Sequence, residues 1–394
     1  MTTMSVPTSA VDPFAPETLA DPHPVWRALR EAGPAVRLTS HPAWVIPRYA
    51  EQRAALIDHA TFSSAEGVGL DPVLNENTRG TVIASDPPAH TRLRTVLASQ
   101  LLPRAMRALT DDILARGDAL VAACVERGSF DAAADLAYPF PVDVVADLLG
   151  LPEEGRDALV GNADAAFVGF GPRDERAAAA MPAVGAMFGY LGSAMAPDRV
   201  RPDGWAAQVW AAAERGEIDH ASVVPLLSAY LVAGMDTTIH GIGNTIDLLA
   251  RDPDAFAGLR ADPSLAGPAF EESLRVESPV TAFFRTTTRE VDVDGVTIPA
   301  GEKVLLPFAS ANRDERRWAD PDRFDVKRRP TGHLAFGAGI HNCAGQFLAR
   351  VEAEAILGAL VRRCSSITPA GPAERALGPV IRGMRALPIT VREV

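Results

Sequence analysis

The stretch FGAGIHNCAG, Phe336–Gly345, places one cysteine and one histidine among three glycines and two alanines. Cys343 stands directly before residues 344–363, AGQFLARVEAEAILGALVRR, whose pattern predicts the last helix of the chain. The free N–H groups and the positive dipole end at the start of such a helix favour the thiolate form of a nearby sulfur. A thiolate in this position can bind a metal ion.

The neighbours of this cysteine suit a flat ligand. Gly337 and Gly345 let the backbone approach a ligand closely, and Phe336 offers a ring face. His341 projects from the same loop and can donate a hydrogen bond to an anionic group. A flat, anionic ligand bound through one sulfur describes haem. A structural cysteine after a glycine-rich turn would give the same ten residues if they stood alone.

Composition excludes several classes of protein. The 394 residues carry a formal net charge of −12, which argues against a duplex-wrapping nucleic-acid binder. Three widely spaced cysteines give neither a disulfide framework nor a four-ligand zinc site. We find no secretory leader pattern and no segment that approaches the roughly 20 apolar residues of a membrane span. We therefore expect a cytoplasmic protein that binds neither nucleic acid nor membrane.

Hydrophobic patterning predicts a mainly α-helical fold with a minor β region. Two short apolar runs, residues 35–39 and 43–47, predict a hairpin, and helical patterns dominate from about residue 49 to 276. The apolar segment 226–252 predicts one long helix that crosses the domain. Residues 291–308 predict a small sheet with a turn at Asp294 and Gly295. We expect a flexible N-terminal segment, 1–20, and one domain, 21–394.

The long helix carries an acid beside a hydroxyl. Ala233, Asp236 and Thr237 lie at i, i+3 and i+4, so they share one helix face. A polar pair on an otherwise apolar helix needs a reason. The pair either serves chemistry or is a satisfied polar pair at a kink.

Two further groups of charged residues recur at helical spacing. Glu272 and Arg275 lie at i, i+3, which by itself is typical of an exposed salt bridge. His90 and Arg94 lie one turn apart, and Arg285 follows the entrance of the predicted sheet. A haem brings two propionates whose buried charge needs cationic or hydrogen-bonding partners. The six other histidines, among them His240, are interpreted as structural.

The stretch FGAGIHNCAG resembles the haem-binding loop of the cytochrome P450 family, F-G-x-G-x-H-x-C-x-G. The resemblance implies a cytochrome P450 fold, a triangular helical prism around a buried haem b. It makes Cys343 the axial ligand of the iron, which favours cleavage of the O–O bond. It also implies that Asp236 relays protons and that Thr237 holds dioxygen and a water molecule.

The same resemblance assigns the remaining charged groups. His90, Arg94, Arg285 and His341 become partners of the propionates. Glu272 and Arg275 become structural, and their set is completed by Arg323 in PDRF, whose guanidinium should bind the glutamate.

More specifically, SSAEGVGL, SPVTAFFRTTTREV and EKVLLPFASANRD resemble bacterial P450s that oxidise para-substituted benzoic acids, for example by O-demethylation. The residues expected to line the substrate pocket are Phe167, Phe170, Phe283, Ala229, Ala233 and Arg79. In those enzymes an Arg and two Ser hold the carboxylate, whereas this sequence has Asn77, Gly80 and Ala229 at these positions. A neutral methoxyphenol or alkylphenol is therefore an alternative substrate.

The chain has no flavin- or nicotinamide-type glycine fingerprint and no cysteine cluster for iron–sulfur. We therefore expect electrons from a ferredoxin and its reductase, with O2 as oxidant. The expected docking patch consists of Arg92, Arg104, Arg316, Arg317 and Arg350. Two alternatives are a P450 hydroxylase of a larger secondary metabolite and a non-catalytic haem-thiolate sensor.

Overall fold

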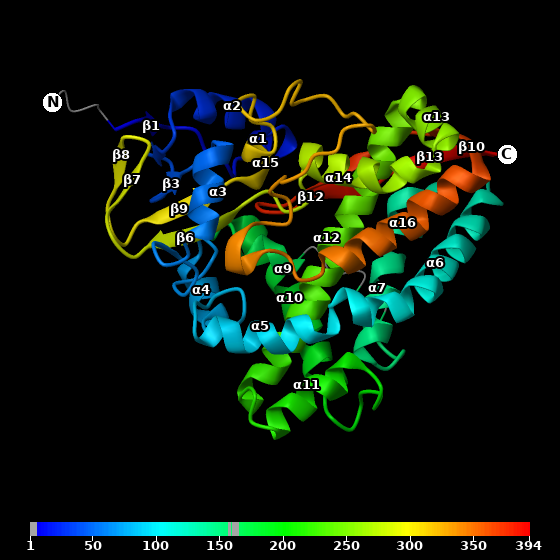
Figure 1. The fold of residues 1–394 in the computed structure, drawn as a ribbon, viewed down its shortest axis with the longest axis horizontal. Helices are drawn as coiled ribbons and strands as arrows, with labels where there is room; N and C mark the ends of the chain where they lie inside the picture. The colour runs from blue at the N-terminus through cyan, green and yellow to red at the C-terminus, as the bar shows by residue number, and fades with distance from the viewer. Residues whose placement is uncertain (1–5, 157–158, 160–164) are drawn as a thin grey trace.

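The computed structural model of the chain describes residues 6–156, 159 and 165–394. Figure 1 shows a molecule with a triangular outline and helices over most of its area. Short strands lie at the upper corner nearest the N-terminus, and others lie toward the C-terminus on the opposite side. The helices are α1 (Pro16–Ala20), α2 (His23–Ala32), α3 (Tyr49–Ile57), α4 (Pro72–Thr78), α5 (Ala89–Gln100), α6 (Pro103–Val125), α7 (Pro139–Leu149), α9 (Ala165–Val168), α10 (Glu175–Ala194), α11 (Trp205–Glu214), α12 (Val223–Arg251), α13 (Pro253–Ala261), α14 (Ala266–Glu277), α15 (Phe308–Ala311) and α16 (Gln346–Arg363). Short turns of other helix types are η1 (Ala133–Ala137), η2 (His220–Ser222), η3 (Pro263–Leu265) and η4 (Gly339–His341).

The strands form one mixed sheet and three small ones. The largest sheet has the order β1-β2-β3-β9-β6-β4, and the others are β10-β13-β5, β11-β12 and β7-β8. Their bounds are β1 (Thr8–Ser9), β2 (Val36–Leu38), β3 (Trp44–Val45), β4 (Phe62–Ser63), β5 (Ser129–Asp131), β6 (Phe283–Thr287), β7 (Val291–Val293), β8 (Val296–Ile298), β9 (Lys303–Leu306), β10 (Cys364–Pro369), β11 (Glu374–Leu377), β12 (Arg382–Ala386) and β13 (Pro388–Glu393).

Helix α12 runs through the middle of the molecule (Figure 1). Most of its residues are buried, and it packs against α7, α14, α16 and β12. A helix that is apolar around nearly its whole circumference is stable only inside a core. Its 29 residues span about 43 Å at a rise of about 1.5 Å per residue. The predicted long central helix is confirmed.

The predicted mainly α fold with a minor β region is also confirmed. β2 and β3 pair antiparallel as the expected hairpin. β7 and β8 form a second hairpin, in which Asp294 and Gly295 take φ angles of 49° and 85°. The strands β10 to β13, after the last helix, were not predicted.

The segment expected to be flexible contains structure from residue 6 onward. Thr8 and Ser9 pair in parallel with β2, and the Arg382 guanidinium donates to the carbonyl of Leu19 at 3.1 Å. The buried side chain of Thr18 donates to the carbonyl of Asp12. Flexibility of this segment stays a prediction.

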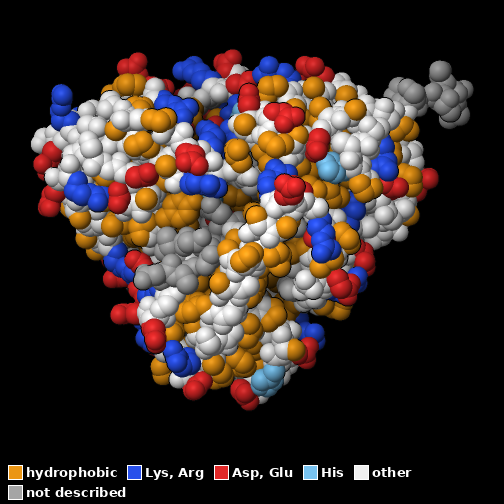
Figure 2. Space-filling model, turned by 180° about the vertical axis from the view of Figure 1, so that it is seen from behind, with side chains coloured by type: hydrophobic (Ala, Val, Ile, Leu, Met, Phe, Trp, Pro, Cys, Tyr) orange, Lys and Arg blue, Asp and Glu red, His pale blue; other side chains and the backbone are white. Residues whose placement is uncertain are grey.

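Among the described residues, two helices are long and apolar enough to cross a membrane, which differs from the sequence expectation. One spans His220–Arg251, includes α12 and is largely buried in the core. The other, α10, is mostly exposed and carries Met181 and Phe188 with 60% and 48% of their surface accessible. In Figure 2, which shows the rear face, acidic and basic side chains lie intermixed around hydrophobic ones.

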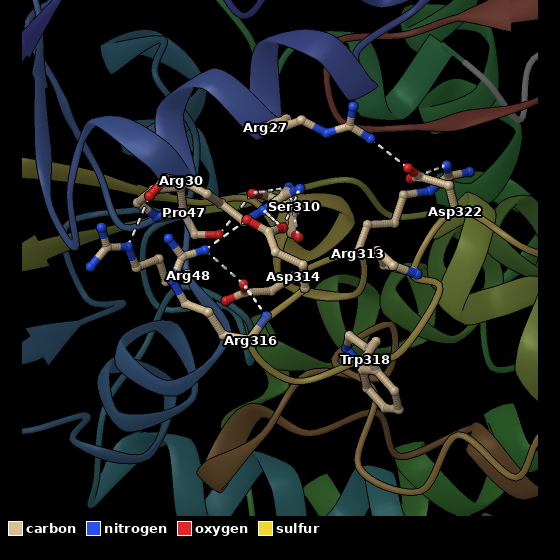
Figure 3. Close-up of polar contacts among 12 residues, drawn as sticks. Arg27, Arg30, Pro47, Arg48, Ser310, Arg313, Asp314, Arg316, Trp318 and Asp322 are labelled. Atoms are coloured by element: carbon tan, nitrogen blue, oxygen red, sulfur yellow. Dashed lines mark hydrogen bonds and ion pairs between the residues drawn. The ribbon is translucent and has the colours of Figure 1, made fainter.

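Helix α2 is fastened to the irregular segment that precedes the cysteine loop, as Figure 3 shows. The buried Arg30 donates to the backbone carbonyl of Ser310 at 3.2 Å, and Ser310 Oγ donates to the carbonyl of Pro47 at 2.7 Å. Farther along, Arg27 and Arg313 both contact Asp322, at 2.5 and 3.0 Å. The N-terminal region therefore braces the loops that lead to the site.

Candidate active site

The cysteine loop, residues 336–345, is closed by its own backbone. The Cys343 N–H donates to the carbonyl of Phe336 at 2.7 Å, and α16 begins three residues after the cysteine. Gly337 and Gly339 take φ angles of 69° and 70°, a region that side chains with a Cβ avoid. A Cβ at Gly339 would also stand 2.3 Å from the carbonyl oxygen of Leu56 on α3. The glycines are therefore needed to seat the loop against α3.

The sulfur of Cys343 lines a cavity of about 330 Å³. Burial raises the pKa of its thiol, and the N–H groups of Gly345 and Gln346 offset only part of that effect. The helix start alone therefore does not make the thiolate that the sequence suggested. A cation bound to the sulfur would supply the missing stabilisation, because a coordinating thiol is deprotonated by its metal.

Two arginines and a histidine converge on the same cavity. Arg94 from α5, Arg285 from β6 and His341 from the cysteine loop all line it. The rings of His90 and His341 meet edge to face with centroids 4.4 Å apart. Burial, reinforced by the neighbouring cations, lowers the pKa of His341 to about 2, and burial lowers that of Arg285 to about 10.

These groups lack an anion to satisfy them. Nε2 of His90 and Nε2 of His341 are buried without a hydrogen-bond partner among the described residues. Unpartnered donors and crowded cations are costly in an apolar interior. Two carboxylates placed among them would reverse that cost, so the residues present fit a haem with its propionates. Phe336 lines the cavity as well, and the Arg350 guanidinium lies over its ring, 4.8 Å from the ring centroid.

Helix α12 forms another side of the cavity. Ala229, Ala233 and Thr237 line it, and Thr237 Oγ1 donates to the Ala233 carbonyl at 2.8 Å. The Asp236 carboxylate is fully buried and lies 3.3 Å from Nε2 of His240, one turn farther along. Asp236 does not line the cavity, so the structure separates the two members of the predicted pair.

The sequence analysis did not predict that His240 would pair with Asp236. The imidazole fits only because β12 has a glycine beside it, since a Cβ at Gly383 would stand 2.0 Å from Nδ1. The ring of Tyr138 meets it edge-on at 6.1 Å. The i, i+4 spacing from Asp236 to His240 was the signal available in the sequence.

The ionic clamp, which we define as Glu272, Arg275 and Arg328, holds the irregular segment beside the cysteine loop. Glu272 and Arg275 are fully buried and form two parallel hydrogen bonds of 2.8 Å. Nη1 of Arg275 also donates to the carbonyls of Asn312 and Pro321, at 2.8 and 2.7 Å. The interpretation as an exposed salt bridge is thereby excluded.

The predicted role of Arg323 in this set is wrong. Its side chain is exposed, and only its backbone carbonyl takes part, accepting from Arg275 at 3.1 Å. Arg328, five residues later, supplies the second guanidinium, with Nε 2.9 Å from Glu272 Oε1. The fold turns Arg328 inward because residues 325–328 wrap around the glutamate, whose Oε1 also accepts from the Asp325 N–H.

The aromatic wall, which we define as Phe167, Phe170 and Phe283, lines the cavity as predicted. The ring centroid of Phe170 lies 5.8 Å from that of Phe167 and 5.5 Å from that of Phe283. Arg79, the predicted substrate contact, is elsewhere. Its guanidinium is exposed and pairs with Glu66 and Glu76 at 3.3 and 3.2 Å.

Comparisons with known proteins agree with this fold and motif order. The cytochrome P450 family model matches residues 265–381. The chain is 45% identical over 388 residues to cytochrome P450 CYP199A2 of Rhodopseudomonas palustris, covering 98% of this chain and 94% of that protein. It is 38% identical over 410 residues to the monooxygenase PikC of Streptomyces venezuelae, covering 99% and 96%. The structure of the CYP116B5 heme domain of Acinetobacter radioresistens superposes with a TM-score of 0.87 at 25% identity, covering 97% of each chain.

The chain belongs to the cytochrome P450 family, whose members are oxidoreductases with a haem iron.

Proposed function

We propose that this protein is a haem-thiolate monooxygenase that oxidises a small para-substituted aromatic compound with O2. The observation that carries the proposal is the placing of Cys343, three basic groups, Thr237 and the aromatic wall around one cavity. Several separate parts of the chain supply these groups, and together they meet the needs of a haem, of oxygen and of a flat substrate.

Cys343 would hold the iron of haem b, and His90, Arg94, Arg285 and His341 would hold its propionates. The bound haem supplies the oxygen activation that no side chain provides. The Thr237 hydroxyl faces the cavity and would keep a proton available at its Oγ1. Asp236 would pass protons toward that hydroxyl from its buried position beside His240.

The reaction is hydroxylation or oxidative O-demethylation. In the second case a methoxyarene, O2, two electrons and two protons give a phenol, formaldehyde and water. The cavity walls would hold the ring and exclude bulk water. Both a para-substituted benzoate such as 4-methoxybenzoate and a neutral methoxyphenol or alkylphenol contain the required ring.

The electrons would come from a ferredoxin and its reductase. Several arginines of the proposed docking patch already have protein partners, since Arg350 pairs with Glu271 and Arg316 with Asp314 and Glu315. Arg317 lies over the ring of Trp318 at 4.6 Å. If the patch steers a ferredoxin, the rate of first electron transfer falls as ionic strength rises; a salt-independent rate rejects the patch.

Reduction under carbon monoxide tests the proposal. The purified protein should show the red-shifted absorption band of thiolate-bound haem and should form product when supplied with O2, a ferredoxin and its reductase. A sensor would show the band without product. A folded, colourless protein that takes up no haem would contradict the proposal altogether.

A further inference from the structure

The part of the cavity away from the cysteine loop has an apolar surface. Its lining there includes Val82, Ile83, Phe170, Val232, Val280 and Phe283. The one phenol in the lining, Tyr230, donates its hydroxyl proton to the backbone carbonyl of Leu97 at 2.5 Å. The hydroxyl of Thr237 donates a hydrogen bond to the Ala233 carbonyl. Neither group offers a positive charge.

Cations in the lining are confined to one end. Among the described residues that line the cavity, only Arg94, Arg285 and His341 can carry positive charge. All three are the groups proposed to neutralise the propionates. The undescribed residues 1–5, 157–158 and 160–164 contain no Lys, Arg or His, so they cannot add a cation.

Two basic residues outside the lining, Arg79 and Lys303, already have partners in the protein. Arg79 pairs with Glu66 and Glu76 at the surface. Lys303 donates to the backbone carbonyls of Glu66 and Gly67 at 2.8 and 3.0 Å. Ala229, which lines the cavity from α12, has no hydrogen-bonding group in its side chain.

We propose that the substrate is a neutral para-substituted arene and that the cavity rejects benzoates. This inference rests on the proposed function and specifies the substrate class of the same site. A benzoate is ionised at neutral pH, and moving a carboxylate into an apolar site without a charged partner is strongly unfavourable. A neutral ring of the same shape incurs no such cost.

Matched ligands test the proposal directly. Binding of 4-methoxybenzoate and of its neutral counterpart 4-methoxyacetophenone is measured on the haem-loaded native protein at pH 7.4 by absorption titration and by calorimetry. We expect the ketone to bind at least about 100-fold more tightly, as befits a buried charge left unpaired. A benzoate that binds equally or more tightly overturns the proposal.

A pair of variants provides the second test. Ala229→Lys places an ammonium group on the cavity side of α12, and Ala229→Met places an uncharged chain of similar length there. The ratio of benzoate to ketone affinity should rise at least about tenfold in the Lys variant relative to the Met variant. Equal ratios in the two folded variants would show that charge at this wall does not select the substrate.

The outcomes separate this inference from the proposed function. Absence of the carbon monoxide band would reject the proposed haem-thiolate enzyme. Calorimetry would still show which of the two ligands the cavity prefers. A normal band with preferred benzoate binding keeps the enzyme and rejects neutral selectivity.

Discussion

The ionic clamp and the aromatic wall differ in how they treat charge. In the clamp, the fully buried Glu272 and Arg275 meet at 2.8 Å, the partly exposed Arg328 binds Glu272 at 2.9 Å, and backbone carbonyls accept the remaining donors. The aromatic wall has no ionisable group and touches the cavity with ring surfaces. The first region has a single arrangement and can only support the site. The second has free surface and is where the choice of ligand is made.

The largest effect should come from the sulfur that lies between these regions. Cys343→Ala removes the proposed ligand of the iron, so the carbon monoxide band and product formation should fall to background. Cys364→Ala is the matched control, because this thiol is buried in the core outside the cavity. A Cys343→Ala protein that keeps the band would contradict the assignment.

The clamp should break when its carboxylate is removed. Glu272→Ala leaves the fully buried Arg275 without its anion, which should cost about 3–5 kcal/mol of unfolding free energy. Urea denaturation measures the change.

Two arginines sharpen this comparison. Arg328→Ala should cost about 1–3 kcal/mol, because it removes one charged hydrogen bond to Glu272. Arg323→Ala should stay within about 0.5 kcal/mol of the parent, because that side chain is exposed. A larger loss of stability in Arg323→Ala than in Arg328→Ala would instead support Arg323 as the second partner of Glu272.

On the cavity side, Thr237→Ala removes the hydroxyl that we propose keeps a proton available. Product formation should fall on the order of 100-fold while O2 consumption continues, because proton delivery is impaired. Thr237→Ser keeps the hydroxyl and should preserve most of the coupling. Oxygen-electrode and product assays on the same samples give the ratio, and an unchanged ratio in Thr237→Ala would exclude the proposed role.

Acid should destabilise the fold through His23, the first residue of α2. Burial, with the nearby Arg313, lowers the pKa of His23 from 6.5 to about 3, so the folded chain keeps this histidine neutral while the unfolded chain protonates it. Stability should therefore fall as pH falls from about 6.5 to 3, by up to about 1.4 kcal/mol per pH unit. In His23→Gln, the plot of unfolding free energy against pH should be less steep, because about one proton fewer is taken up on unfolding. Parallel plots for the two proteins would show that His23 makes no contribution.

The smallest effect on ligand binding should come from the aromatic wall. Phe170→Ala removes one ring face from the cavity and should weaken binding of an aromatic ligand by about 0.5–1.5 kcal/mol. Phe256→Ala, which removes a core ring outside the cavity, is the control for general loosening. Equal losses of affinity in both variants would mean that Phe170 acts only through packing.

The sequence was sufficient where the chemistry is local. Cys343, His341 and the loop glycines lie within ten residues, and the spacing from Ala233 to Thr237 predicts their shared face on α12. The burial of His240 beside Asp236 was not predictable, because it depends on space left by Gly383, 143 positions after the histidine in the chain.

Contacts between residues far apart in the chain could not be predicted for the same reason. Arg323 and Arg328 stand in one irregular segment, and only the path of the backbone decides which guanidinium faces Glu272. The strands after α16 have partners such as β5, more than 200 residues earlier, and a strand is stable only when paired.

The fastening of α2 also has a consequence for how the molecule forms. Arg30 and Ser310 are separated by 280 positions, and Arg382 and Leu19 by 363. Contacts between such distant positions require closure of long loops and so form slowly. During synthesis Ser310 leaves the ribosome long after Arg30, so α2 can brace the loops that lead to the site only after most of the described chain has emerged, and cofactor capture becomes a late event in the life of the nascent protein.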